Sequence, residues 1–210
     1  MLNAAVRTGR KSKLYRPARF LLIAAFFILL LAGCGGVAPV AKVGLVAPFE
    51  GRHRAIGYDV LYSARLAVRE INGAGGIGGT RVALVALDDG GTPESAHAAA
   101  ASLLVDPDVV AVVGHWLPET TEAVQEQYAH AELVFVPGGT APYLPVDAQQ
   151  LSPDFVAAYA AVTPFDEMPG PYAAPAYAAY ENLWALLAKA QAQQGEISRA
   201  SVWQALNTTG

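Results

Sequence analysis

Apolar and polar residues follow two alternating patterns between residues 42 and 136. Short runs in which nearly every residue is apolar predict buried strands. They alternate with longer segments whose apolar residues recur every three or four positions, as in an amphipathic helix. The expected strands cover residues 42–47, 81–87, 109–113 and 133–136.

The segments between these strands carry helix signals. Residues 58–72 place their apolar side chains on one face at helical spacing. Thr92 precedes Pro93, a typical N-cap followed by a first helical proline, and Pro118 opens the next helix in the same way. Strands that alternate with helices predict an α/β fold, a doubly wound parallel sheet of the flavodoxin-like type.

The alternation ends at the stretch PYLPVDAQQLSPDFVAAY, residues 142–159. Helical patterns follow it and no strand pattern returns. One helix is expected after Ser152, a long one over 171–194, and a third after Ser198, which is a good N-cap residue.

The first 33 residues have the layout of an export signal. Six basic residues precede an apolar run at 20–31, which is too short to span a membrane comfortably. The run ends in Leu-Ala-Gly-Cys, which resembles the lipobox of bacterial lipoprotein precursors. That resemblance implies cleavage before Cys34 and acylation of its thiol. A plain signal peptide, or an N-terminal anchor with an incidental cysteine, is the alternative.

Removal of this leader changes the charge of the chain. The whole sequence carries a formal charge of −4, and residues 1–33 contain six basic and no acidic residues. The remaining chain is therefore at about −10, which makes it a poor partner for nucleic acid or anionic surfaces. We expect its membrane attachment to come from lipid on Cys34, not from a basic patch. The single cysteine also excludes an internal disulfide.

Four stretches carry a resemblance to a known family. They read VGLVAPFEG, ARLAVREINGAGGIGGTRVALVALDDGGTPESA, VVAVVGHW and VPGGTAPYL, and they lie between residues 43 and 144. Together they resemble the substrate-binding proteins of ABC transporters for branched-chain amino acids, which are type I periplasmic binding proteins. The late segment with DFVAAYAAVTPFDEMPGPYAAPAYAAYENLWALLAKA is similar to the late helices of that family.

The resemblance implies a division of the chain. In full-length members a long stretch between the two matching blocks builds most of a second lobe, and final strands follow the late helices. The sequence lacks both, so we expect a single lobe whose two halves are joined near residue 145. A degenerate gene whose product folds poorly is the alternative. The expected parts are a lipoprotein signal peptide at 1–33, a tether at 34–41, the N-terminal lobe at 42–144, a junction at 145–152 and late helices packing on the same lobe at 153–210.

Ligands of open α/β sheets bind at the carboxyl ends of the strands. The resemblance places an amino-acid ligand against the loops at 114–121 and 137–142. In the family, hydroxyls and backbone groups of these loops hold the ligand's carboxylate and ammonium. The candidate ligand-binding residues are Ile56, Trp116, Leu117, Pro118, Gly138, Gly139 and Thr140.

This half-site departs from the family's pattern. Thr140 and Gly138 match the positions that supply a hydroxyl and a carbonyl. Pro118, however, stands where the family has a carboxylate-binding serine, and proline has neither hydroxyl nor N–H. Ile56 stands near a position that is often aromatic. We therefore expect weakened binding of amino acids, from micromolar toward millimolar or worse.

These features favour an extracytoplasmic solute-binding protein with an amino acid or similar small molecule as ligand. Its expected partners are an ABC permease and, through the N-terminal lipid, the membrane, but not nucleic acid. We expect no catalysis, cofactor or metal. A lipid-anchored interaction or regulatory protein is the alternative, and so is a truncated remnant without function. His115 remains open between lining a pocket and filling the core.

Overall fold

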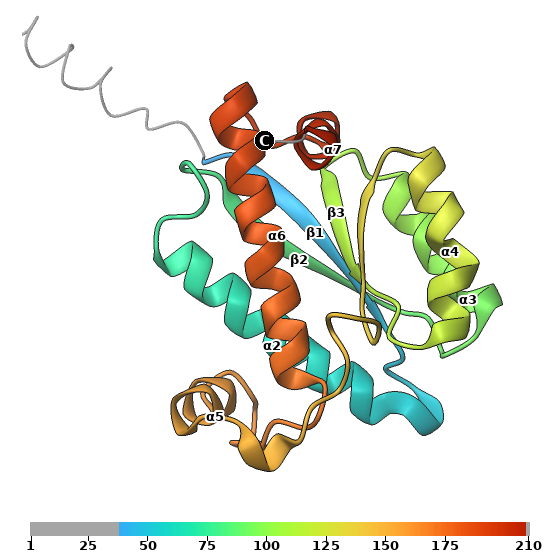
Figure 1. Cartoon of the computed structure of the whole chain (residues 1–210), viewed down its shortest axis with the longest axis vertical. Helices are drawn as coiled ribbons and strands as arrows, with labels where there is room; N and C mark the ends of the chain where they lie inside the picture. The colour runs from blue at the N-terminus through green and yellow to red at the C-terminus, as the bar shows by residue number, and fades with distance from the viewer. Residues whose placement is uncertain (1–37, 209–210) are drawn as a thin grey trace, which may run out of the picture. The chain divides into compact units, whose positions relative to one another are not determined.

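The computed structural model describes residues 38–208. The predicted signal peptide, Cys34 and the first half of the predicted tether lie outside these residues. The described part forms one compact unit around a parallel sheet of four strands (Figure 1). The strands stand in the order β2-β1-β3-β4 and are β1 (Val40–Ala47), β2 (Arg81–Asp88), β3 (Val109–Gly114) and β4 (Val134–Pro137). This arrangement confirms the predicted α/β fold with a parallel, doubly wound sheet.

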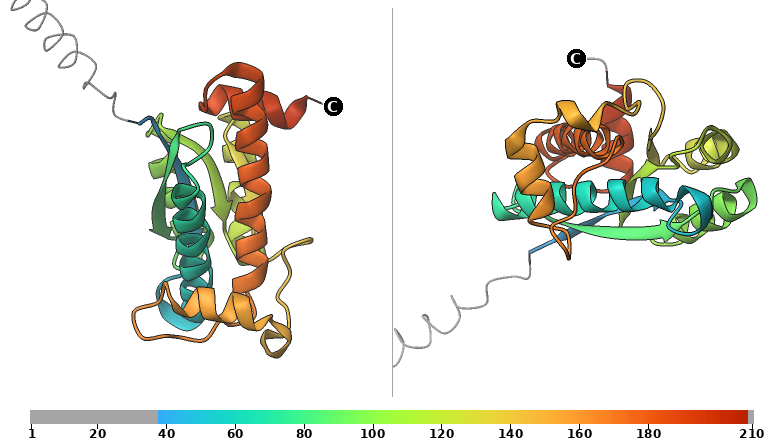
Figure 2. Two further views of the ribbon diagram at one scale, coloured as in Figure 1. Left: turned by 90° about the vertical axis from the view of Figure 1, so that its left-hand side faces the viewer. Right: turned by 90° about the horizontal axis from the view of Figure 1, so that it is seen from below.

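Helices cover both faces of the sheet (Figure 2). One face packs against α2 (Arg54–Gly73), α6 (Ala173–Gln194) and α7 (Arg199–Asn207). The other face packs against α3 (Pro93–Leu104) and α4 (Pro118–His130). A short helix, α5 (Pro153–Ala160), lies on α2 away from the sheet. Two 3-10 turns, Gly51–His53 and Ala148–Gln150, complete the elements.

The strand residues divide between two cores because successive side chains of a strand point to opposite faces. Val43 and Leu45 of β1 belong to the core on the α2 face, and Val46 belongs to the core on the α3 face. The central strand β3 is buried along its whole length, whereas the edge strand β2 is half-exposed. The continuous apolar runs in the sequence therefore belong to strands covered on both sides.

The predicted helix starts at Thr92, Ser152 and Ser198 are confirmed. Each side chain accepts a hydrogen bond from the backbone N–H three residues later. Helix α2, in contrast, begins four residues before the predicted position. Gly57 explains this earlier start, since a Cβ at Gly57 would lie 2.2 Å from the carbonyl oxygen of Pro48. Only glycine allows the first turn of α2 to lie this close to the loop after β1.

The late helices close the α2 face of the sheet. Helix α6 lies along α2, with Tyr180, Leu183 and Leu187 buried between them and the strands. The Ser63 hydroxyl donates to the carbonyl oxygen of Ala173 at 2.7 Å, which fixes the start of α6 on the middle of α2. The segment from β4 to α6 crosses the carboxyl edge of the sheet and includes α5 (Figure 1).

Candidate ligand-binding site

The loops that follow β3 and β4 lie together at the carboxyl edge of the sheet. The N–H of Gly138 donates to the carbonyl oxygen of Gly114 at 3.0 Å, which joins the two loops directly. The parallel pairing of β3 with β4 sets this position. The structure therefore brings the two predicted ligand loops into contact, as expected of neighbouring strands in a parallel sheet.

Trp116 and the two glycines of the β4 loop form a packed unit. The Trp116 side chain is 1% exposed. A Cβ at Gly138 would lie 2.5 Å from two atoms of the Trp116 ring, and a Cβ at Gly139 would lie 2.5 Å from the Trp116 carbonyl oxygen. Gly139 also has φ +67°, which favours glycine. These glycines are needed so that the β4 loop can lie on the indole.

The other predicted site residues differ in accessibility. Leu117 is buried, while Ile56 and Thr140 are half-buried and Pro118 is exposed. The Thr140 hydroxyl donates to the carbonyl oxygen of Pro137 at 3.3 Å, within its own turn. Pro118 begins α4 and offers neither N–H nor hydroxyl to this edge. Of the predicted side chains, Pro118 is thus the most accessible, and Thr140 is the one accessible residue that carries a hydroxyl.

One polar atom of this unit has no partner among the described residues. The indole N–H of Trp116 is buried without a hydrogen-bond acceptor. The Tyr172 ring approaches the indole edge-on, with 6.2 Å between ring centroids. Because a buried donor without an acceptor is costly, an acceptor atom at this position would be stabilised.

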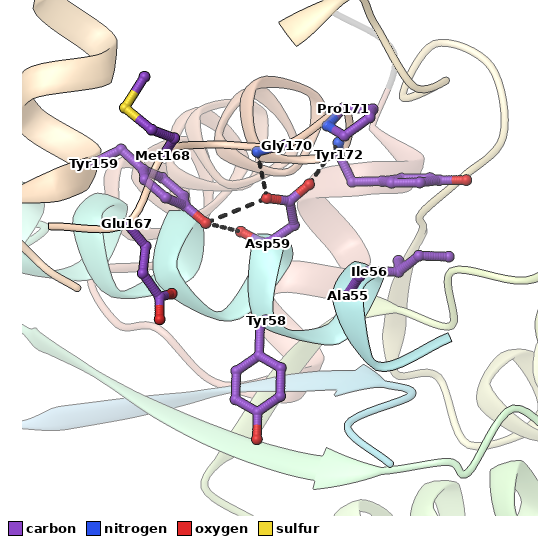
Figure 3. A pocket seen from close by; sticks show the side chains of 10 residues that line it. All are labelled: Ala55, Ile56, Tyr58, Asp59, Tyr159, Glu167, Met168, Gly170, Pro171 and Tyr172. Atoms are coloured by element: carbon purple, nitrogen blue, oxygen red, sulfur yellow. Dashed lines mark hydrogen bonds between the residues drawn. The ribbon is translucent and has the colours of Figure 1, made fainter. Parts of the chain in front are cut away.

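A pocket of about 450 Å³ lies beside this unit, between the start of α2 and the segment that leads into α6 (Figure 3). Ile56 is the one predicted site residue that lines it. Its volume lies in the range of small-molecule sites. The lining residues are Ala55, Ile56, Tyr58, Asp59, Tyr159, Glu167, Met168, Gly170, Pro171 and Tyr172.

Asp59 holds the far wall of the pocket in place (Figure 3). Its carboxylate accepts from the N–H of Gly170 at 2.6 Å, from the N–H of Tyr172 at 3.0 Å and from the hydroxyl of Tyr159 at 3.3 Å. Burial raises the pKa of Asp59, and the two backbone N–H groups oppose that shift. Asp59 is not among the site residues predicted from the sequence. An acid within the apolar face of a helix was the signal that could have identified it.

We expect Asp59→Asn to lower the free energy of unfolding at pH 7 by about 1–3 kcal/mol, because one amide oxygen cannot replace two carboxylate oxygens as acceptors. The pH dependence has a definite sign. With its pKa raised above 3.8 in the fold, Asp59 binds protons more tightly in the native state. Its contribution to stability is therefore fully present when the pH lies below the pKa of Asp59 in the unfolded chain. The contribution declines as the pH rises through the higher pKa of Asp59 in the folded chain.

Urea unfolding of the wild type and D59N at pH 4, 5.5 and 7 measures this effect. The advantage of the wild type over D59N should be largest at pH 4. Glu167→Gln removes an exposed acid from the same pocket and should change stability by less than about 0.5 kcal/mol. If the stability advantage of the wild type over D59N grew from pH 4 to pH 7, the fold would lower the pKa of Asp59 and not raise it.

His115 belongs to the core and does not line this pocket. Its ring is fully buried, with Nδ1 at 3.0 Å from the Asp89 carboxylate and Nε2 at 3.1 Å from the Tyr128 hydroxyl. The Thr121 hydroxyl donates to the His115 carbonyl oxygen at 2.5 Å. The structure thus resolves the open alternative for His115 in favour of the core. Within residues 38–208, no group of three or more His, Cys, Asp or Glu side chains is placed to hold a metal ion.

No helix among residues 38–208 is long and apolar enough to cross a membrane.

Comparisons with known proteins agree with these features. The sequence profile of a family described as periplasmic binding protein matches residues 40–150. An amino acid binding protein of Pseudomonas aeruginosa is 37% identical over 101 residues, which cover 48% of this chain and 27% of the relative. A Leu/Ile/Val-binding protein of Escherichia coli is 31% identical over 130 residues, covering 58% of this chain and 35% of the relative. The chain thus matches about a third of these relatives' length, or less.

A solved structure extends the likeness of the fold. A protein from Rhodospirillum rubrum, described as a branched-chain amino acid ABC transporter, has a TM-score of 0.63 at 15% identity. The match covers 80% of this chain and 88% of that chain, so the two are similar in length. A chain of this size therefore occurs elsewhere with the same fold.

Proposed function

Because the chain belongs to the periplasmic binding protein family, we propose that it is an extracytoplasmic solute-binding protein anchored by lipid on Cys34. The observation that carries this proposal is the pocket of about 450 Å³ at the carboxyl edge of the sheet. Its position agrees with the general place of ligands in open α/β sheets, and its size suits a small solute. An amino acid or a similar molecule is the proposed ligand, and an ABC permease is the proposed partner.

The chemistry of the pocket favours weak binding of an amino acid. Glu167 can pair with the ammonium of such a ligand, and Ile56 and Met168 can contact an apolar side chain. No Lys, Arg or His is among the lining residues to hold the carboxylate. The N–H groups of Gly170 and Tyr172 already donate to Asp59. A ligand carboxylate therefore loses water without gaining a charged partner, which costs affinity.

Calorimetric unfolding of residues 35–210 with and without 10 mM amino acid tests the proposal. A dissociation constant near 1 mM stabilises the native state by about 1.4 kcal/mol at this concentration. We expect leucine, isoleucine or valine to raise the Tm by a few degrees at most. No shift with any amino acid at 10 mM would count against an amino acid as the ligand.

Two substitutions locate the ligand. Ile56→Asp should abolish the shift if the ligand lies in the pocket, and Thr140→Val should reduce it if the ligand lies on the β4 loop. Val105→Asp places the same new charge on a residue that is 83% exposed at the end of α3, so the ligand shift should persist. An equal shift in all three variants would exclude both places.

One observation favours the alternative of an interaction protein. Five large apolar side chains at the carboxyl edge are exposed by 42–83%: Tyr58, Leu144, Val146, Phe165 and Met168. Exposed apolar side chains of this kind are typical of a surface that another protein covers. Absence of any ligand shift, together with self-association in analytical ultracentrifugation that Phe165→Asp abolishes, would support this second function.

A further inference from the structure

Positive charge gathers at one place on the described surface, although the chain is acidic. Residues 35–210 contain eight Lys and Arg residues. Three of them, Arg65, Arg69 and Arg81, line a single hollow of about 440 Å³ between α2 and β2. The net charge alone predicts no affinity for anions, but the arrangement of these side chains creates a local site that the net charge conceals.

The three guanidinium groups are free to bind an anion. In the described part of the chain none of them forms an ion pair. Arg65 lies over the Tyr62 ring at 5.7 Å, and one nitrogen of Arg69 donates to the carbonyl oxygen of Ala161 at 3.3 Å. These contacts orient the two side chains and leave most of their N–H donors open. A guanidinium group binds phosphate through two parallel N–H donors.

Three acidic groups on neighbouring elements are already engaged, and Glu167, which lies close enough to Tyr62 under Arg65 to act on it, does not line the hollow. The carboxylate of Glu70 accepts from the Tyr177 hydroxyl, on the side of α2 that faces α6. Asp106 and Asp108, at the amino edge of the sheet, bind Lys42 at 2.8 and 3.1 Å. No acid lines the hollow itself, whose other walls are Val68, Leu84, Asn72 and Gly73. An anion that enters it meets arginines and short apolar side chains.

The hollow lies where the chain enters the lobe. The N–H of Arg81 donates to the carbonyl oxygen of Pro39 at 2.8 Å, and Val40 pairs with Arg81 in the sheet. Figure 1 shows the start of β1 beside the turn from α2 to β2. Four residues separate Cys34 from Pro39, which makes five residue steps. A fully extended chain of that length spans less than about 20 Å, so a lipid on Cys34 keeps this edge of the lobe near the membrane surface.

We propose that Arg65, Arg69 and Arg81 form a site for the phosphate of an anionic phospholipid headgroup, which orients the tethered lobe on the membrane. The proposal rests on the proposed lipid anchor at Cys34. The site lies on the flank of the sheet, between the second half of α2 and the first half of β2, and shares no lining residue with the ligand pocket. Binding there lays this flank of the lobe on the lipid and leaves the pocket, which other residues line, open to solutes.

Arginine-specific modification by phenylglyoxal, read residue by residue with mass spectrometry, tests the site. The chain from residue 34, checked for a cooperative unfolding transition, is coupled through its single cysteine to a maleimide-bearing lipid in vesicles. The chemical anchor makes the result independent of natural acylation and of solute binding. Vesicles of phosphatidylcholine alone are compared with vesicles that contain phosphatidylglycerol, at 50 mM and 500 mM salt.

We expect phosphatidylglycerol to slow the modification of Arg65, Arg69 and Arg81 about fivefold at 50 mM salt, with little effect at 500 mM. Arg52 and Arg54, beside the start of α2, serve as internal references whose rates should stay unchanged. In R65Q/R69Q the protection of Arg81 should disappear. In R52Q/R54Q, which removes the same charge, the protection should persist.

Three results would overturn the proposal. Equal rates on both kinds of vesicle would show that the arginines bind no lipid. Equal slowing of all arginines, including Arg52 and Arg54, would show nonspecific adsorption. Protection by 10 mM inorganic phosphate without vesicles, with no further effect of phosphatidylglycerol, would show a site for a soluble anion instead of a lipid.

Discussion

Replacement of His115 by phenylalanine is expected to lower the free energy of unfolding by about 3–5 kcal/mol. The Asp89 carboxylate is fully buried, and its Oδ2 lies 3.0 Å from Nδ1 of His115. Phenylalanine keeps a planar ring but removes both nitrogens, so the carboxylate retains only the N–H of Gly91 as a donor. The Tyr128 hydroxyl loses its partner as well.

The orientation of this network follows from its groups. In the tautomer that carries its proton on Nδ1, the ring donates to Asp89 and its Nε2 accepts from the Tyr128 hydroxyl. Burial raises the pKa of Tyr128, so this hydroxyl stays protonated. The network joins the loop after β2, the loop after β3 and helix α4, which packs on the face opposite the pocket.

Denaturant unfolding of H115F, H115N and D89N/H115F separates the contributions. Asparagine tolerates the positive φ of 36° at this position and can still donate to Asp89, so H115N should lose less than H115F. D89N should restore part of the stability of H115F, since it removes the stranded charge, and should destabilise the wild type. A loss below about 1 kcal/mol in H115F would show that the pair does not support the fold.

Gly114→Ala should lower the free energy of unfolding by about 3 kcal/mol or more. Gly114 ends β3 with φ +144°, and a Cβ there would lie 2.2 Å from the carbonyl oxygen of Val46. Gly114 and Val46 lie on β3 and β1, the two central strands of the sheet. Neither strand can move away from the added Cβ without breaking the sheet. The expected loss combines overpacking with backbone strain.

Gly73→Ala is the matched control. Gly73 ends α2, its φ is not positive, and a Cβ would meet nothing within 4 Å. Alanine there should be neutral or stabilise by about 0.4–1 kcal/mol. Thermal and denaturant unfolding of both variants gives the comparison. Equal stability of G114A and G73A would mean that β3 and β1 leave room for a Cβ at Gly114.

Local sequence patterns predicted the elements well because their signals are local. The apolar runs of β1 and β3 and the caps at Thr92 and Ser198 depend on neighbouring residues, and all four are confirmed. The start of α2 was placed too late, because helical periodicity does not reveal that Gly57 allows a close approach to Pro48.

The site was less predictable because it depends on how distant segments meet. Asp59 has a role only because Gly170 and Tyr172, more than 100 residues later, turn their N–H groups toward it. The burial of Trp116 depends in the same way on the β4 loop and on Tyr172. The cluster of Arg65, Arg69 and Arg81 forms because a helix and a strand bring the three side chains together. The net charge of the whole chain does not reveal such a local cluster.

The hydrogen bond between Ser63 and Ala173 also bears on when the protein can fold. These residues lie 110 positions apart, and α6 supplies much of the core on the α2 face. That core cannot close until the last fifth of the chain, which begins near α6, is present, and contacts of such long sequence separation form slowly. Late closure suits the export that we propose for this chain, because a polypeptide whose core forms only when its C-terminal helices arrive has no closed core to unfold before it crosses a membrane.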